Sequence, residues 1–332
     1  MLEKILENKF DIVLQKICEN FGIVLYYPFS LMIEPINMCN LGCPACPTGS
    51  GKMNRPKYAT SYDEFKGIID QCRCHIKNII LWNFGEPFLN KDLLKMINYA
   101  HISGMHVMTS TNGHFFKSEE FCLDIIRSGL DRLIVCLDGA DQDVISKYRK
   151  NAKFDDIING FRLLCEAKKQ IGSKTPIIEL QFILMKHNEH QRQYMRQLAN
   201  QLGADVYTEK TVGIGPDRTD EEFQNLANEL LPNDLSLSRY LKRNGVFVPK
   251  YRSNKCPDVY RTTVINSNGT VIPCCYDESS RYIMGNIFEE SLNSIWRNDK
   301  YQNFRKRIRK DRKSIPLCAK CSENTCIIKI KI

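Results

Sequence analysis

The chain has 332 residues, of which 43% are hydrophobic, and its formal net charge is +9. That length and composition favour a globular protein with one large domain or two unequal ones. Because no apolar run reaches the length of a secretory signal core or a membrane span, we expect a cytoplasmic protein without a membrane span. In that setting the 15 cysteines favour metal ligands and buried thiols over disulfides.

Strand and helix patterns alternate through the first two thirds of the chain. A predicted helix over residues 2–20 comes first, and six strand patterns then alternate with amphipathic helix patterns. The predicted strands cover residues 31–36, 78–82, 106–109, 132–137, 177–185 and 205–207. The predicted helices cover residues 61–72, 93–102, 119–127, 142–149, 154–169 and 190–202. Helical crossovers make the strands parallel, so the fold class is α/β, with a sheet that is either open or curled into a barrel.

Three cysteines follow the first predicted strand in the order Cys39-x3-Cys43-x2-Cys46. Structural zinc sites and iron–sulfur clusters usually take four protein ligands, so three thiolates in one loop leave one metal position open. An open position is where chemistry can occur. The alternatives are a zinc knuckle whose fourth ligand lies elsewhere, or three thiols that merely pack.

Polar turns also follow the next three predicted strands. Gly85-Glu86-Pro87 follows the second, Thr111-Asn112-Gly113 the third and Asp138-Gly139 the fourth. In barrels and open α/β sheets alike, sites are built at the carboxyl ends of the strands. We therefore expect these turns and the cysteine loop to converge on one rim.

The pattern changes after about residue 249. Residues 261–265 and 270–272 flank an Asn-Gly turn, which predicts a hairpin. Four cysteines around it can complete a tetrahedral site for zinc or for an iron–sulfur cluster: Cys256, Cys274, Cys318 and Cys321. Cys275 and Cys326 are left as unassigned thiols.

A basic run extends from Arg297 to Lys313, with nine basic residues against two acidic ones. It is either a solvated helix face or a surface that attracts an acidic partner. Aromatic residues are not interleaved as a stacking platform would need, so a nucleic-acid partner is not expected. No general base is assigned, because five histidines are predicted to be solvated residues without a partner: His101, His106, His114, His187 and His190.

Taken together, the cysteine triplet, Gly85-Glu86-Pro87, Thr111-Asn112-Gly113 and Leu137-Asp138-Gly139 followed by Tyr148-Arg149 resemble the radical S-adenosylmethionine (SAM) enzymes. The resemblance implies a partial (β/α)6 TIM-like barrel over residues 30–235, after a lead-in over residues 1–29. It also implies that Cys39, Cys43 and Cys46 hold a [4Fe–4S] cluster. The amino and carboxylate groups of SAM would chelate the fourth iron.

The same resemblance assigns SAM contacts to the strand-end turns. Gly85 and Glu86 would face the methionine amino group, Thr111 and Asn112 would lie near the ribose, and Arg149 would reach the methionine carboxylate. Cys136 stands where close relatives often carry serine, and Ala45 stands where the family commonly has an aromatic residue. The alternative for Arg149 is a surface arginine on a helix.

The second cysteine set resembles the SPASM or shorter twitch extension of radical SAM enzymes. This implies a small α+β domain over residues 236–332 that holds one auxiliary [4Fe–4S] cluster through Cys256, Cys274, Cys318 and Cys321. The spacing is close to that of the 2-deoxy-scyllo-inosamine dehydrogenase type, which oxidises a sugar-like alcohol.

The resemblance implies reductive cleavage of SAM to a 5′-deoxyadenosyl radical that abstracts a substrate hydrogen, with an electron then passing to the auxiliary cluster. The expected reaction is dehydrogenation of a small polar or sugar-like molecule, with flavodoxin or ferredoxin as the external reductant. The alternative is a peptide- or protein-modifying maturase with a peptide substrate. A further alternative from another class is a non-enzymatic iron–sulfur electron carrier.

Overall fold

The computed structural model describes residues 13–14, 17–18, 20–250, 254–322 and 327–331. The predicted helix over residues 2–20 therefore lies mostly outside the described residues, and Cys326 lies outside them. Among the helices of the described residues, none is both long and apolar enough to cross a membrane.

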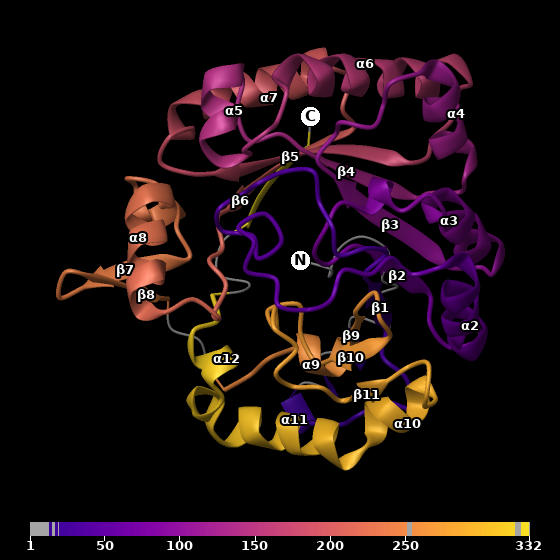
Figure 1. Ribbon diagram of the computed structural model, residues 1–332, viewed down its shortest axis with the longest axis vertical. Helices are drawn as coiled ribbons and strands as arrows, with labels where there is room; N and C mark the ends of the chain where they lie inside the picture. The colour runs from indigo at the N-terminus through magenta and orange to yellow at the C-terminus, as the bar shows by residue number, and fades with distance from the viewer. Residues whose placement is uncertain (1–12, 15–16, 19, 251–253, 323–326, 332) are drawn as a thin grey trace.

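Ten strands form one curved sheet in the order β11-β10-β9-β1-β2-β3-β4-β5-β6-β12 (Figure 1). The six strands from β1 to β6 are parallel to one another, as predicted. Their bounds are β1 Ser30–Ile33, β2 Asn78–Leu81, β3 His106–Thr111, β4 Arg132–Cys136, β5 Ile177–Leu184 and β6 Val206–Thr211. Strand β6 continues to Thr211, beyond the predicted end at residue 207. The prediction ended too early because the polar residues of this strand hide its pattern of alternating apolar residues.

Six helices cover the outer face of this sheet (Figure 1). They are α2 Tyr62–Cys72, α3 Leu93–Ile102, α4 Glu119–Arg127, α5 Gln142–Tyr148, α6 Phe154–Gln170 and α7 Arg192–Gln201. Each end agrees with the predicted range to within two residues. Local capping explains the agreement at α2, where Ser61 and Glu64 form a reciprocal capping box.

The C-terminal part of the chain extends the same sheet at both edges. Strand β9 (Thr262–Ile265) runs parallel to β1, and β10 (Thr270–Ile272) folds back on it as the predicted hairpin. Strand β12 (Ile327–Lys331) pairs antiparallel with β6 at the opposite edge. The boundary at residue 235 stays a prediction, since the strands on both sides of it share one sheet.

The remaining elements follow β6. They are α8 Asp220–Leu230, β7 Tyr240–Arg243, β8 Val246–Pro249, α9 Asp258–Arg261, β11 Gly285–Asn286, α10 Leu292–Arg297, α11 Asp299–Asp311 and α12 Pro316–Ala319. Single 3-10 turns lie at Pro87–Leu89, Glu189–Gln191, Leu235–Leu237 and Arg312–Ser314. Helices α10 and α11 lie beyond the β9–β11 end of the sheet, away from α6 (Figure 1).

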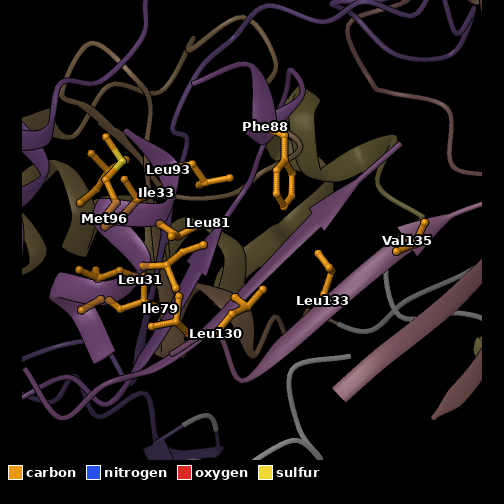
Figure 2. Close-up of a cluster of buried hydrophobic side chains, with 14 of the residues drawn as sticks. Leu31, Ile33, Ile79, Leu81, Phe88, Leu93, Met96, Leu130, Leu133 and Val135 are labelled. Carbon is orange, nitrogen blue, oxygen red and sulfur yellow. The ribbon is translucent and has the colours of Figure 1, made fainter. Parts of the chain in front are cut away.

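The largest hydrophobic core lies between the sheet and its outer helices. Figure 2 shows alternate residues of β1, β2 and β4 in this layer, among them Leu31, Ile79 and Leu133, together with Leu93 and Met96 of α3. Such strands bury alternate side chains on each face. Each fully buried Leu or Ile side chain contributes about 1.5–3 kcal/mol, so this layer holds the strands in register.

A second apolar layer lines the inner face of the curved sheet. Met32, Met108, Ile134 and Val264 belong to it, from β1, β3, β4 and β9. On β5 and β6 the residues facing the same interior include Glu179 and Lys210. One side of the barrel interior is therefore apolar and the other is polar.

A candidate active site between two cysteine sets

The loop after β1 holds Cys39, Cys43 and Cys46, all partly buried. The Gly42 backbone N–H donates to Lys150 O at 3.1 Å, which fixes the loop against the end of α5. Burial raises the pKa of all three thiols and takes that of Cys43 to about 12. Thiolate ligands in this loop therefore need a bound cationic centre to balance their charge.

Within the part of the chain that the structure describes, no three His, Cys, Asp or Glu side chains converge closely enough to hold a single metal ion. The cysteines of a [4Fe–4S] cluster each bind a different iron and need not converge on one point. The spread of Cys39, Cys43 and Cys46 along one loop suits such a cluster.

The turn after β2 fits closely against the lead-in to the cysteine loop. Gly85 has φ +84°, and a Cβ there would lie 2.2 Å from Ile36 O, so only glycine is compatible with this geometry. The Glu86 N–H donates to Met38 O at 2.8 Å. The turn is thereby held directly beside the cysteine loop.

The Glu86 carboxylate is buried and ties this turn to the next one. It accepts hydrogen bonds from Thr111 Oγ1 and Asn112 N, both at 2.8 Å, and from Phe88 N at 3.2 Å. Burial raises the pKa of Glu86 to about 7, although these three donors favour its charged form. The structure thus brings Gly85, Glu86, Thr111 and Asn112 together, as expected at one rim.

Asn112 also joins the cysteine loop to His114. Its Nδ2 donates to Asn40 Oδ1 at 2.7 Å, and its Oδ1 accepts from His114 Nδ1 at 2.8 Å. His114 Nε2 accepts from the Lys153 backbone N–H at 3.0 Å, which places the ring proton on Nδ1. The prediction of a solvated His114 without a partner is therefore wrong, and burial lowers its pKa. It is also wrong for the half-buried His106, whose Nε2 lies 3.5 Å from Asp131 Oδ1.

Arg149 lies just after α5 and is only 8% exposed. Its Nε donates to Asp138 Oδ2 at 2.7 Å, while Asp138 Oδ1 accepts from Ile183 N at 2.7 Å. The positive charge of Arg149 favours the thiolate form of Cys43. The alternative of a surface arginine is wrong, because the side chain is held between the buried Asp138 and the cysteine loop.

Cys136, at the end of β4, faces the barrel interior. Its Sγ lies 3.4 Å from Ser110 Oγ and accepts from Gln181 Nε2 at 3.4 Å. The charge of Arg149 favours the thiolate form of Cys136 as well. The predicted contact of Cys136 with SAM stays a prediction.

Arg312 is a charged neighbour of the second cysteine set. Burial lowers the pKa of Arg312, but Cys321, Cys256, Cys318 and Cys274 outweigh that effect and raise it above its ordinary value. One guanidinium is therefore within electrostatic reach of all four predicted auxiliary ligands. Burial raises the pKa of Cys256 and Cys318 to about 12, so this set also needs a cationic centre to ionise.

Cys275 is a neighbour of this set. A hydrogen bond with Cys275, together with burial, raises the pKa of Cys274 well above its ordinary value. Cys275 also lines the cavity described next, so it lies on the barrel side of the set.

A cavity of about 420 Å³ lies between the two cysteine sets. Ala45 to Pro47 of the cysteine loop line one part of it, and Pro273 to Tyr276 line another. The lining also includes the apolar residues Met32, Met108, Ile134 and Val264 and the polar residues Glu179, Lys210, Arg239 and Glu278. The predicted SAM contacts do not line it, although their chain neighbours Phe84 and Tyr148 do.

The sequence did not point to Glu278. Its side chain is 7% exposed, its Oε2 makes no hydrogen bond within the described residues, and the nearest cation is Arg218 Nη1 at 3.6 Å. Burial raises the pKa of Glu278 to about 7. It lies in an irregular polar stretch after β10, where no periodic pattern marks a buried residue.

Glu179 and Arg132 were also missed, although the sequence carries a signal for them. They form a buried ion pair across β4 and β5, with Arg132 Nε donating to Glu179 Oε2 at 2.8 Å. A charged residue inside an otherwise apolar strand needs a buried partner. That rule, applied to the segment 177–185, indicates an inward-facing carboxylate.

Comparison with known proteins places this arrangement in a family. Residues 33–179 match the radical SAM superfamily, and residues 256–322 match SPASM, an iron–sulfur cluster-binding domain. The chain is 23% identical over 307 residues to the tungsten-containing aldehyde ferredoxin oxidoreductase cofactor-modifying protein of Pyrococcus furiosus, covering 83% of this chain and 82% of that protein. A 60-residue stretch is 38% identical to the S-adenosyl-L-methionine-dependent 2-deoxy-scyllo-inosamine dehydrogenase of Niallia circulans, covering 18% of this chain and 24% of that enzyme.

Two solved structures share the fold. BtrN in complex with AdoMet and 2-DOIA superposes with a TM-score of 0.57 at 19% identity, over 91% of this chain and 95% of that one. SuiB of Streptococcus suis bound to precursor peptide SuiA gives a TM-score of 0.63 at 17% identity, over 96% of this chain and 76% of that one. The partial TIM-like barrel predicted from the sequence is confirmed.

The two matched domains also confirm the expected cofactors, SAM and iron–sulfur clusters, one cluster site in the barrel and further cluster binding in the C-terminal region. The chain therefore belongs to the radical SAM superfamily and carries a C-terminal SPASM domain.

Proposed function

We propose that the protein is a radical SAM oxidoreductase that dehydrogenates a small polar molecule in the cavity between the two cysteine sets. One observation carries the proposal: Cys46 and Cys274 line the same cavity. A substrate held there would lie between the site where hydrogen abstraction starts and a site that can accept an electron. The volume of about 420 Å³ lies within the range of small-molecule sites.

The ligand assignment rests on the spacing of the cysteines within the two matched domains. Cys39, Cys43 and Cys46 would hold the SAM-binding cluster, and Cys256, Cys274, Cys318 and Cys321 would hold one auxiliary [4Fe–4S] cluster. When bound, these cofactors supply the 5′-deoxyadenosyl radical and an electron acceptor. Arg149 and Arg312 each place a positive charge beside one thiol set, which favours the ionised ligands.

The residues of the rim position SAM. Arg149, held by Asp138, would bind the methionine carboxylate, and Gly85 and Glu86, whose turn lies beside the cysteine loop, would face the amino group. Thr111 and Asn112, which donate to the Glu86 carboxylate, would lie near the ribose. Cys136 contributes a weak hydrogen-bonding sulfur next to this group.

The cavity lining protects the reaction and orients the substrate. Met32, Met108 and Ile134 form an apolar wall that excludes water from a reactive centre. Glu278 and Lys210 present ionisable groups on the polar side. A polar substrate with several hydrogen-bonding groups suits this lining.

Two assays test the proposal on anaerobically reconstituted protein. Iron analysis should give about eight irons per chain, and dithionite-reduced protein with SAM should form 5′-deoxyadenosine. Replacing Cys39, Cys43 and Cys46 by alanine should remove about half of the iron and all SAM cleavage. Cys122→Ala, at a buried thiol of the outer core, is the matched control and should keep both.

Deuterium transfer from labelled substrates into 5′-deoxyadenosine then separates the substrate classes. Transfer from a small polyol or amino-sugar alcohol supports the proposal. Transfer only from a peptide would favour the maturase alternative. Absence of 5′-deoxyadenosine in every condition would contradict both enzymatic functions.

A further inference from the structure

Seven of the nine basic residues between Arg297 and Lys313 are exposed, on α11 and the turns at its ends. The other two, Arg305 and Arg312, are buried. Arg305 donates to the backbone oxygens of Val259 and Trp296 and stacks 4.0 Å from the centres of the Trp296 and Tyr301 rings. Arg305 thus fixes the helix and Arg312 is buried just after its end, while the other basic residues are exposed.

Part of this exposed set forms one stripe, which we call the α11 basic stripe: Lys306, Arg307, Lys310 and Lys313. The spacing of Lys306, Arg307 and Lys310 puts them along one side of α11, and Lys313 lies in the 3-10 turn that follows the helix. Asp311 is the acidic residue within the stripe, and its Oδ1 is engaged by the Lys313 backbone N–H. The stripe is a compact positive surface, which attracts acidic proteins and speeds their association.

The stripe adjoins the segment that carries Cys318. Arg307 Nη2 donates to Ser314 O at 3.0 Å, and Cys318 lies in α12, where its backbone N–H donates to Ile315 O at 2.9 Å. Arg307 belongs to the stripe, and Arg312 follows α11 immediately. The charged surface and the predicted auxiliary ligands are therefore on neighbouring sides of one short segment.

We propose that the α11 basic stripe docks an acidic one-electron carrier protein that exchanges electrons with the auxiliary cluster. This inference rests on the proposed function, because the cluster needs a route to return the electron it receives from substrate. In that exchange the auxiliary cluster is oxidised by one electron and the carrier is reduced by one; a flavin carrier takes one proton from solvent as its neutral semiquinone forms, and no group is transferred. Small acidic carriers such as flavodoxins fit this surface in charge.

Flavodoxin is the probe for the test. The reduced holoprotein, freed of dithionite, is mixed anaerobically with oxidised flavodoxin at low ionic strength, and semiquinone formation is followed by stopped-flow absorption. Lys306→Glu/Lys310→Glu should lower the second-order rate about tenfold and flatten its dependence on salt. The matched control is Lys169→Glu/Lys174→Glu, two exposed lysines at and after the end of α6, the helix on the opposite side of the molecule (Figure 1).

The control removes the same charge and should change the rate by less than about twofold. Equal rates for the two double variants, or no transfer from the unaltered protein to flavodoxin, would overturn the docking proposal. Iron content and dithionite-driven SAM cleavage are measured for each variant, and both should stay unchanged. If the unaltered protein does not cleave SAM, the proposed function is contradicted instead. Failure of the docking proposal and failure of the proposed function are therefore distinguishable.

Discussion

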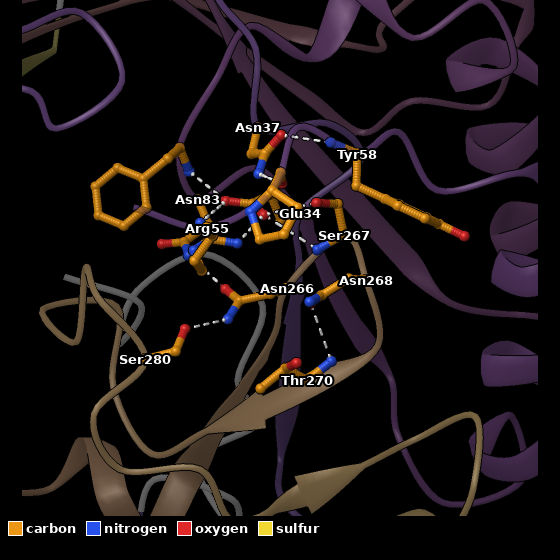
Figure 3. Close-up of polar contacts among 12 residues, drawn as sticks. Glu34, Asn37, Arg55, Tyr58, Asn83, Asn266, Ser267, Asn268, Thr270 and Ser280 are labelled. Atoms are coloured by element: carbon orange, nitrogen blue, oxygen red, sulfur yellow. Dashed lines mark hydrogen bonds and ion pairs between the residues drawn. The ribbon is translucent and has the colours of Figure 1, made fainter. Parts of the chain in front are cut away.

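Glu34 and Arg55 form a buried ion pair with two hydrogen bonds, from Nη1 to Oε2 and from Nη2 to Oε1, each 2.7 Å long (Figure 3). The same carboxylate accepts from Phe84 N and from the N–H and Oγ of Ser267. The pair therefore joins the segment after the cysteine loop, the turn before Gly85 and the C-terminal hairpin. One carboxylate holds both halves of the candidate site.

Glu34→Gln should lower the free energy of unfolding by about 3–5 kcal/mol, because Arg55 is left as a buried charge without a counterion. Urea unfolding of the variant and of the unaltered protein measures this difference in free energy. Lys66→Ala, which breaks the exposed pair with Asp70, is the control and should cost less than about 1 kcal/mol. Similar losses of free energy of unfolding in both variants would contradict the stabilising role of the buried Glu34–Arg55 pair.

Gly85→Ala should disrupt the turn after β2, since the new Cβ would meet Ile36 O at 2.2 Å. Gly104→Ala is the matched control, because Gly104 also has a positive φ, +77°, but no atom lies within 4 Å of its added Cβ. The control should cost about 1–2 kcal/mol for backbone strain alone. Gly85→Ala should cost more in urea unfolding and should also reduce 5′-deoxyadenosine formation; equal effects would mean that the close approach is unimportant.

Arg149→Met should lower SAM cleavage by about tenfold or more, the effect of losing a charge-assisted hydrogen bond, while iron content is retained. Saturation with SAM separates weaker binding from slower cleavage, and binding should account for most of the loss. Arg196→Met, at an exposed position on α7, should leave cleavage unchanged. Normal SAM binding by Arg149→Met would show that Arg149 does not contribute to the SAM-binding site.

Glu278 should make stability depend on pH in a defined direction. Its folded-state pKa of about 7 lies above its ordinary value because burial outweighs the favourable charge of Arg218, and Asp217 raises it further. The folded protein then binds more protons than the unfolded chain between about pH 4.5 and 7, so this group lowers stability as the pH rises through that window.

Glu278→Gln should abolish that decline. The difference in free energy of unfolding between the variant and the unaltered protein should change in favour of the variant by up to about 3 kcal/mol as the pH rises from 5 to 8. Denaturant unfolding at both pH values checks this. Glu289→Gln, at an exposed position, is the control, and its stability should depend on pH as that of the unaltered protein does. If the stabilities of both variants depend on pH in the same way, burial does not suppress the ionisation of Glu278.

Local signals explain what the sequence predicted well. The helices Leu93–Ile102 and Glu119–Arg127 match their predicted ranges, because amphipathic spacing and caps such as Ser118 act within a few residues. The hairpin of β9 and β10 was likewise readable from its Asn-Gly turn.

Distant contacts explain what the sequence could not predict. Strand β9 pairs with β1 from more than 200 residues away, and no local pattern identifies that neighbour. His114 looked solvated because its partners, Asn112 and the Lys153 backbone, meet only after two turns are folded together. Glu278 is a candidate site residue because it lies near Arg218 and lines the cavity, and both relations depend on distant parts of the chain.

The pairing of β9 with β1 and of β12 with β6 has a consequence for how the protein is made. On the ribosome, β1 to β6 emerge first, and both outer strands keep unpaired backbone groups until the last segments of the chain arrive. Unpaired edges of this kind recruit other strands and promote aggregation. Synthesis therefore passes through an interval in which both edges of the nascent sheet are open to pairing with other strands.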